Sequence, residues 1–146
     1  MALYQSILVA VDLSADAKTV ISKAHSLSQQ FSAKLTLLTV VEPLVTETGY
    51  DLLPVLSVDV EKSLVDRAQH FLVEIAAELG INDCHKQVEI GSVKGEVLRV
   101  VADAGHDLVV LGTHGRHGFA TLLGSTANAI LHGTPCDVLA VRVGGK

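Results

Sequence analysis

Five short runs rich in apolar and β-branched residues punctuate the chain. They span residues 7–11, 35–41, 85–90, 108–111 and 137–143. The first two are apolar on both faces, which is typical of central parallel strands covered above and below by helices. The run at 85–90 instead alternates apolar and polar positions, which favours a strand at the edge of a sheet. The pattern therefore predicts five strands.

Apolar positions at helical spacing predict a helix between each pair of consecutive strands. Ser14 or Asp16 can cap the first helix, and Gly80 is a typical residue for ending the second. The first predicted helix ends near Phe31, and the second runs from about Asp59 to Leu79. The third runs from the 91–95 turn to Gly105, and the fourth spans residues 126–132.

The segment 42–58 shows neither the alternation of a strand nor the spacing of a helix. Pro43, Gly49 and Pro54 interrupt it, although most of its other residues are apolar. A loop of this length is more often a lid, a binding segment or a partner contact than a plain connector.

Strands that alternate with helices through short connections predict an α/β fold. We expect one domain over residues 1–146, with an open, parallel, five-stranded, Rossmann-like sheet and helices on both of its faces. In such sheets ligands bind beyond the carboxyl ends of the strands, where the strand order reverses. Asp12, the strand end near Val40, and Gly112 would converge there.

A glycine-rich loop joins the predicted strand at 108–111 to the following helix. It carries Gly112, Gly115 and Gly118 and ends at Gly124-Ser125-Thr126. Glycine lets the backbone approach a ligand closely, and the first N–H groups of a helix have no partner inside it, so this arrangement suits a phosphate. The GxxGxxG spacing matches neither the dinucleotide motif nor the P-loop, so spacing alone leaves a plain flexible loop open. We interpret the loop as an anion site, most plausibly for a nucleotide.

Charge and composition narrow the possible partners. The 146 residues carry a net charge of −5, with scattered Lys and Arg and only two tyrosines, three phenylalanines and no tryptophan. These features argue against a nucleic-acid partner. The apolar runs are far shorter than the roughly 18–20 residues that cross a bilayer, and the first residues show no secretory signal, so no membrane is expected and the cytoplasm is the expected compartment. Cys84 and Cys136 lack disulfide or metal spacing and are interpreted as free thiols.

The chain resembles the universal stress proteins over nearly its whole length. The residues that carry the resemblance lie at the strand ends and turns, at 7–14, 37–41, Gly91, 107–112, 124–127 and 135–141. The resemblance implies a parallel sheet of order 3-2-1-4-5. It also implies a homodimer in which the last strands of two subunits pair antiparallel.

The nucleotide-binding branch of that family carries a G-x2-G-x9-G-S/T loop. Here Gly112 and Gly115 are followed by residues 116–123 and then by Gly124-Ser125, so the spacer has eight residues, one fewer than the branch pattern. The opening at 10–14 also resembles the other branch, which lacks the glycines and does not hold ATP. Because the glycines are present here, we favour nucleotide binding.

The resemblance further implies a role for individual residues. The backbone near Val40 would meet the adenine, and Asp12 would lie close to the nucleoside. The remaining contacts would be made by the loop: Gly112 and Gly115 to ribose and phosphates, Gly124, Ser125 and Thr126 to the phosphates. Mg²⁺ would be held mostly by the phosphates of ATP, ADP or AMP. Arg116 could add charge to the polyphosphate or simply lie exposed.

Three classes of function follow. The first is an adenine-nucleotide-binding regulatory module of the stress response that acts on unknown protein partners. The second is a slow ATPase or self-phosphorylating protein with Ser125 or Thr126 as acceptor; no carboxylate or histidine base is evident beside either, and no catalytic residue is assigned. The third is a stress protein that binds no nucleotide and acts only through protein contacts. His114 and His117 are interpreted as solvated loop residues, so no metal ligand is assigned either.

Overall fold

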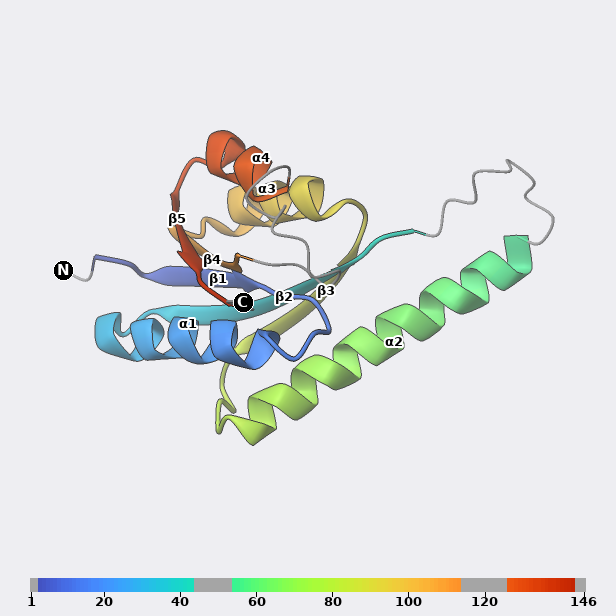
Figure 1. The fold of residues 1–146 in the computed structure, drawn as a ribbon, viewed down its shortest axis with the longest axis horizontal. Helices are drawn as coiled ribbons and strands as arrows, with labels where there is room; N and C mark the ends of the chain where they lie inside the picture. The colour runs from blue at the N-terminus through green and yellow to red at the C-terminus, as the bar shows by residue number, and fades with distance from the viewer. Residues whose placement is uncertain (1–2, 44–53, 114–125, 144–146) are drawn as a thin grey trace.

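Strands and helices alternate along the chain (Figure 1). The computed structural model describes residues 3–43, 54–113 and 126–143, with only the backbone of residues 54–58. The elements are β1 (Ser6–Ala10), α1 (Ala17–Phe31), β2 (Lys34–Val41), α2 (Pro54–Glu78), β3 (His85–Ile90), α3 (Val93–Ala104), β4 (Leu108–Gly112), α4 (Thr126–Gly133) and β5 (Asp137–Val141).

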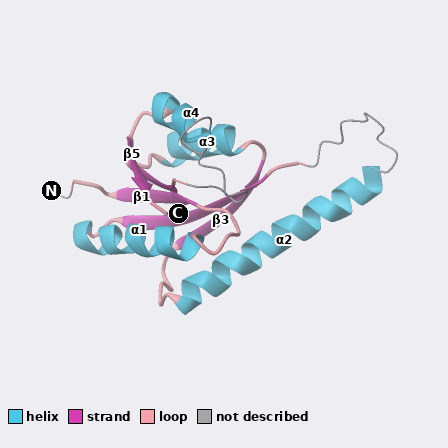
Figure 2. Ribbon diagram, viewed as in Figure 1, coloured by secondary structure: helices cyan, strands magenta, loops and turns pink. Residues whose placement is uncertain are grey.

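The five strands form one parallel sheet in the order β3-β2-β1-β4-β5. This confirms the predicted fold class, the strand order, and the placement of residues 85–90 at an edge. Helices α1 and α2 cover one face of the sheet, and α3 and α4 cover the other (Figure 2). None of the helices in the described part of the chain combines the length and the apolar content that crossing a membrane requires.

An apolar core lies on each face of the sheet. Along β2, Leu37 belongs to the core under α1 and α2, whereas Leu38 and Val40 pack in the core under α3 and α4. Because successive strand residues point to opposite faces, Thr39 lies on the α1/α2 face. This alternation explains why the central strands are apolar at nearly every position.

Two element boundaries differ from the sequence prediction by more than one residue. Helix α2 begins at Pro54 and not near Asp59. Proline is favoured in the first turn of a helix, where its missing N–H is not needed, so Pro54 starts this helix and does not interrupt a loop. Strand β5 ends at Val141 and not at Val143; the Val143 N–H instead donates to the Thr113 hydroxyl at 3.0 Å. The rest of the predicted 42–58 loop, residues 44–53, lies outside the described residues.

The predicted cap of α1 is also wrong. Asp16 occupies the N-cap position, but its side chain makes no capping hydrogen bond. Its backbone is already right-handed helical (φ −74°, ψ −16°), whereas a capping side chain requires an extended N-cap residue. Ser14 belongs to the turn before the helix, where its carbonyl accepts from the Ala17 N–H at 3.2 Å.

The segment before β4 fixes the start of β1. The Asp107 carboxylate accepts from the backbone N–H groups of Gln5 at 2.8 Å and Ser6 at 3.0 Å. Beside it, His106 is buried, with Nδ1 2.9 Å from the Ser6 hydroxyl and no partner for Nε2 among the described residues. Burial lowers the pKa of His106; Asp107 raises that pKa and His85 lowers it further, and the net shift is downward.

Acidification should destabilise the protein through His106. A histidine of the unfolded chain takes up a proton near pH 6.5, whereas native His106 takes one up only at lower pH. Below about pH 6.5 the unfolded state therefore binds more protons than the native state does. As the pH is lowered, the free energy of unfolding should decrease by at most about 1.4 kcal/mol per pH unit, until the pH reaches the native pKa of His106. Urea denaturation between pH 7.5 and 5 measures this loss. His106→Gln should remove most of it and His132→Gln, at an exposed site, should not; equal pH profiles for His106→Gln and wild type would contradict the assignment.

Candidate functional site

The central strand ends before its neighbours and leaves a crevice at the carboxyl edge of the sheet. β1 stops at Ala10, whereas β2 continues to Val41 and β4 to Gly112. The N–H of Val11, just after β1, still donates to the Leu38 carbonyl at 2.9 Å. Beyond this bond the backbones of β2 and β4 face each other across the space that β1 no longer fills.

The hydrogen-bonding direction of each strand shows which peptide groups face the crevice. The Leu38 carbonyl points toward β1, and the Val41 carbonyl points the other way, where it accepts from Gly91 N–H at 3.0 Å. Because this direction alternates along a strand, the peptide groups of Val40 point toward the β1 side. On β4, the Thr113 N–H donates to the Val141 carbonyl of β5 at 2.9 Å. By the same alternation, the peptide groups of the preceding residue, Gly112, point toward β1. Two strands thus offer backbone donors and acceptors to the crevice.

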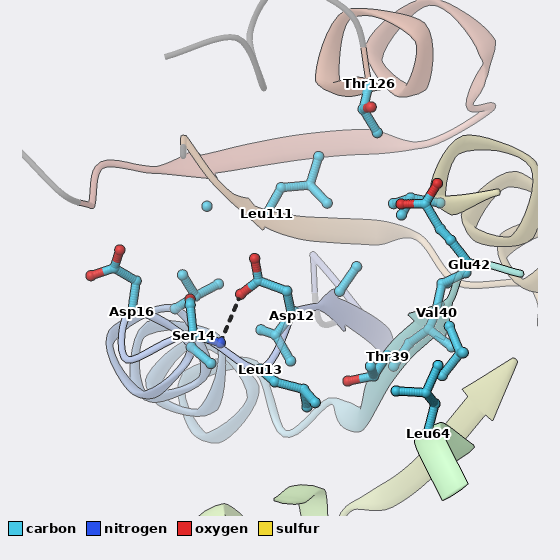
Figure 3. A pocket seen from close by; sticks show the side chains of 18 of the residues that line it. Asp12, Leu13, Ser14, Asp16, Thr39, Val40, Glu42, Leu64, Leu111 and Thr126 are labelled. Carbon is cyan, nitrogen blue, oxygen red and sulfur yellow. Dashed lines mark hydrogen bonds between the residues drawn. The ribbon is translucent and has the colours of Figure 1, made fainter. Parts of the chain in front are cut away.

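A cavity of about 700 Å³ lies at this edge, within the usual size range of small-molecule pockets (Figure 3). Its place corresponds to the point where the strand order reverses: α1, which follows β1, covers one face, and α4, which follows β4, covers the other. The lining residues come from β1, β2 and β4, from the segments that follow β1, β2 and β5, and from all four helices: Ala10, Val11, Asp12, Leu13, Ser14, Asp16, Ala17, Val20, Leu38, Thr39, Val40, Val41, Glu42, Pro43, Val60, Leu64, Val93, Leu111, Gly112, Thr126, Ile130 and Val143.

Asp12 follows β1 and lines the cavity. Its Oδ1 accepts from the Ser14 N–H at 3.1 Å, which closes the turn before α1 (Figure 3). Asp12 thus stabilises the turn that leads into α1. Its second carboxylate oxygen has no hydrogen bond to the described residues and is available to a ligand.

Four of the eight predicted site residues meet at this cavity. Asp12, Val40, Gly112 and Thr126 all line it, although they are separated by up to 114 positions in the chain (from 12 to 126). Thr126 is the first residue of α4, so the amino end of that helix lies at the cavity edge. The other four predicted residues, Gly115, Arg116, Gly124 and Ser125, lie outside the described residues, and their roles stay predictions.

Sequence reasoning missed the side chains that helices and strand interiors contribute. Leu64 of α2 belongs to the apolar stripe of its helix, and nothing in its spacing distinguishes a cavity wall from a packed interior. Val93 lies at the start of α3, in the segment predicted only as a turn. Thr39 did carry a signal, because it is a polar residue inside an otherwise apolar run at 37–41. Glu42 is a third carboxylate in the cavity lining, in addition to Asp12 and Asp16.

The composition of the cavity suits binding better than acid–base chemistry. Most of its lining side chains are apolar, and its charged side chains are the carboxylates of Asp12, Asp16 and Glu42. Within the described residues the lining includes no histidine, and no group of three histidine, cysteine or carboxylate side chains could hold a metal ion. A divalent cation would therefore need ligands from a bound molecule, as Mg²⁺ commonly takes from phosphates.

Comparisons with known proteins place this fold and chain in one family. The profile of the Universal stress protein family matches residues 3–142. Universal stress protein A homolog 2 of Coxiella burnetii is 42% identical over 144 residues, which cover 98% of each chain. Among solved structures, the universal stress protein UspA from Lactobacillus plantarum shares 24% identity and superposes with a TM-score of 0.84, covering 97% of this chain and all of its own.

Two further solved structures contain a nucleotide. A universal stress protein in complex with cAMP is 22% identical, with a TM-score of 0.64 over 97% of this chain and 98% of its own. A universal stress protein family protein from Arabidopsis thaliana with AMP bound is 18% identical, with a TM-score of 0.64 over 97% of this chain and 93% of its own. At these identities the superpositions establish a shared fold. With the family profile and the Coxiella relative, they lead to one conclusion: the chain belongs to the universal stress protein family.

Proposed function

We propose that the protein is a regulatory module of the stress response that binds an adenine nucleotide in the cavity at the carboxyl edge of its sheet. The observation that carries this proposal is the crevice between β2 and β4, where the peptide groups of Val40 and Gly112 face an apolar cavity. A planar base can hydrogen-bond to strand backbone there while its faces contact apolar side chains. The amino end of α4 at Thr126 lies on the same cavity and favours negative charge.

Each part of the nucleotide would meet a different part of the site. The backbone of Val40 would contact the adenine, and the Asp12 carboxylate would contact the nucleoside. Gly112 with Gly115 would approach the ribose and phosphates. Gly124, Ser125, Thr126 and Arg116 would hold the phosphates, and Mg²⁺ would be bound mainly by phosphate oxygens. The AMP and cAMP in the two solved structures of the family support an adenine nucleotide as the ligand class.

We also propose that the module is a cytoplasmic homodimer made of one domain over residues 1–146. Strand β5 pairs with β4 on one side, and the described part of the chain leaves its other side unpaired. Two copies could align their β5 strands antiparallel, which would satisfy the unpaired backbone groups of both.

Nucleotide binding should raise the melting temperature. A ligand at a hundredfold excess over its dissociation constant stabilises the native state by about 2.7 kcal/mol. We therefore expect thermal shifts of several degrees with Mg-ATP, Mg-ADP or AMP at saturating concentration, measured by differential scanning fluorimetry. Isothermal titration calorimetry of the same ligands then gives the affinity order. No shift and no heat with any of the three at millimolar concentration would contradict the proposal and leave a role through protein contacts alone.

A further inference from the structure

The Thr39 side chain is an unusual feature of the cavity wall. It is only 4% exposed, and its Oγ1 has no hydrogen-bond partner among the described residues. A buried hydroxyl without a partner destabilises a fold, and valine has nearly the same shape without that disadvantage. Buried polar groups are normally hydrogen-bonded, so we expect the hydroxyl to find its partner outside the described residues.

The position of Thr39 indicates where that partner would come from. Thr39 lines the cavity and precedes Val40, whose peptide groups face the crevice. Figure 3 shows the Thr39 hydroxyl turned toward Leu13, with Leu64 of α2 on the other side of Thr39. Together with Val11 and Val20, these residues form an apolar recess on the α1/α2 face, here called the Thr39 recess. In this recess Thr39 supplies the one side-chain hydroxyl.

The cavity lining has two chemically different parts. Asp12 and the amino end of α4 at Thr126 form a polar part of the cavity lining, whereas the Thr39 recess is apolar with a single side-chain hydrogen-bonding group. A molecule with a polar sugar-phosphate end and a flat, weakly polar end that carries hydrogen-bonding atoms at its edge matches both parts. A purine base has such an edge, with ring nitrogens that accept and an exocyclic amino group that donates.

We propose that Thr39 is a specificity-determining residue of the nucleotide site, and that its hydroxyl hydrogen-bonds to the edge of the purine base. The inference rests on the proposed nucleotide binding and adds a side-chain contact to the backbone contact at Val40. A hydroxyl both donates and accepts, so it can pair with a ring nitrogen or with an amino group. Binding thereby satisfies a hydroxyl that is buried and has no partner among the described residues.

Thr39→Val tests this contact because it removes only the hydroxyl. Calorimetric titration with AMP should show roughly a 3- to 10-fold loss of affinity relative to wild type, the usual worth of one hydrogen bond. The melting temperature of the ligand-free variant should equal or exceed that of wild type, since no internal bond is lost. Thr39→Ser keeps the hydroxyl and should bind AMP within about twofold of wild type, allowing for its lost methyl group.

Thr36→Val is the matched control. Thr36 is also buried (7% exposed), lies in the same strand, and is not among the residues that line this cavity, so its variant should bind AMP like wild type. Adenosine lacks the phosphate, and it should bind to Thr39→Val more weakly than to wild type by the same factor as AMP does. A loss confined to AMP would assign the hydroxyl to the phosphate and overturn the base contact.

Two failures can be told apart. If wild type binds AMP and Thr39→Val binds it equally well, the Thr39 contact is overturned while the nucleotide site stands. If the ligand-free Thr39→Val protein melts below wild type, the hydroxyl has an internal partner and the contact is likewise overturned. If wild type binds no nucleotide, the proposed function fails and the inference fails with it.

Discussion

Leu8→Ala is expected to lower the free energy of unfolding by about 2–5 kcal/mol. Leu8 is completely buried in β1, which pairs with β2 on one side and β4 on the other. Its side chain belongs to the core under α3 and α4, where the surrounding strands and helices cannot all move inward to fill the space left by three missing carbons. Since domains are stable by only about 5–15 kcal/mol, this one substitution would remove a large share of the total.

Urea denaturation measures the Leu8→Ala effect. The midpoint should shift to lower urea while the slope stays close to that of wild type, because the surface exposed on unfolding hardly changes. Leu131→Ala is the matched control, since Leu131 on α4 is 44% exposed and its truncation should cost far less. Equal midpoints for the two variants would show that the centre of the sheet is not packed as described.

The fold could be predicted because its signals are local. Parallel strands covered on both faces must be apolar at successive positions, and the runs at 7–11 and 35–41 show this directly. The errors arose where one residue type serves two purposes. Pro54 can interrupt a loop or begin a helix, and Asp16 can cap a helix only if its backbone is extended, which the sequence does not reveal.

The site could be predicted only in part, for a related reason. Asp12, Val40 and Gly112 were found because the ends of parallel strands share one edge of the sheet. The crevice itself depends on β1 ending at Ala10, one residue before its apolar run ends, and on the direction in which each peptide group then points. Neither feature is encoded in a motif. Helix side chains such as Leu64 reach the cavity through tertiary packing, which periodicity does not specify.

Gly112→Val is expected to weaken AMP binding at least about tenfold, or about 1.4 kcal/mol. The backbone of Gly112 does not have a positive φ, so a side chain is compatible with its strand conformation. Glycine is therefore not needed there for the chain to turn. Val110 of β4 packs on the α1/α2 face, and because side chains alternate along a strand, a side chain at position 112 would point to that face as well. The lack of a side chain at Gly112 leaves this part of the cavity open, and a valine would crowd the approach of the ligand to the backbone.

The expected signature of Gly112→Val is a loss of affinity without a loss of fold. Valine is favoured in strands, so the ligand-free variant should melt close to wild type, while calorimetry with AMP should show the weakened binding. The affinity of Gly112→Ala for AMP should lie between that of wild type and that of Gly112→Val, because the steric effect grows with side-chain size. Ala140→Val adds bulk to the exposed face of neighbouring β5, where Ala140 pairs with Leu111, and should leave binding unchanged. If Gly112→Val bound AMP as tightly as wild type does, the nucleotide would not pass along β4, and the role of Gly112 in the site would have to be abandoned.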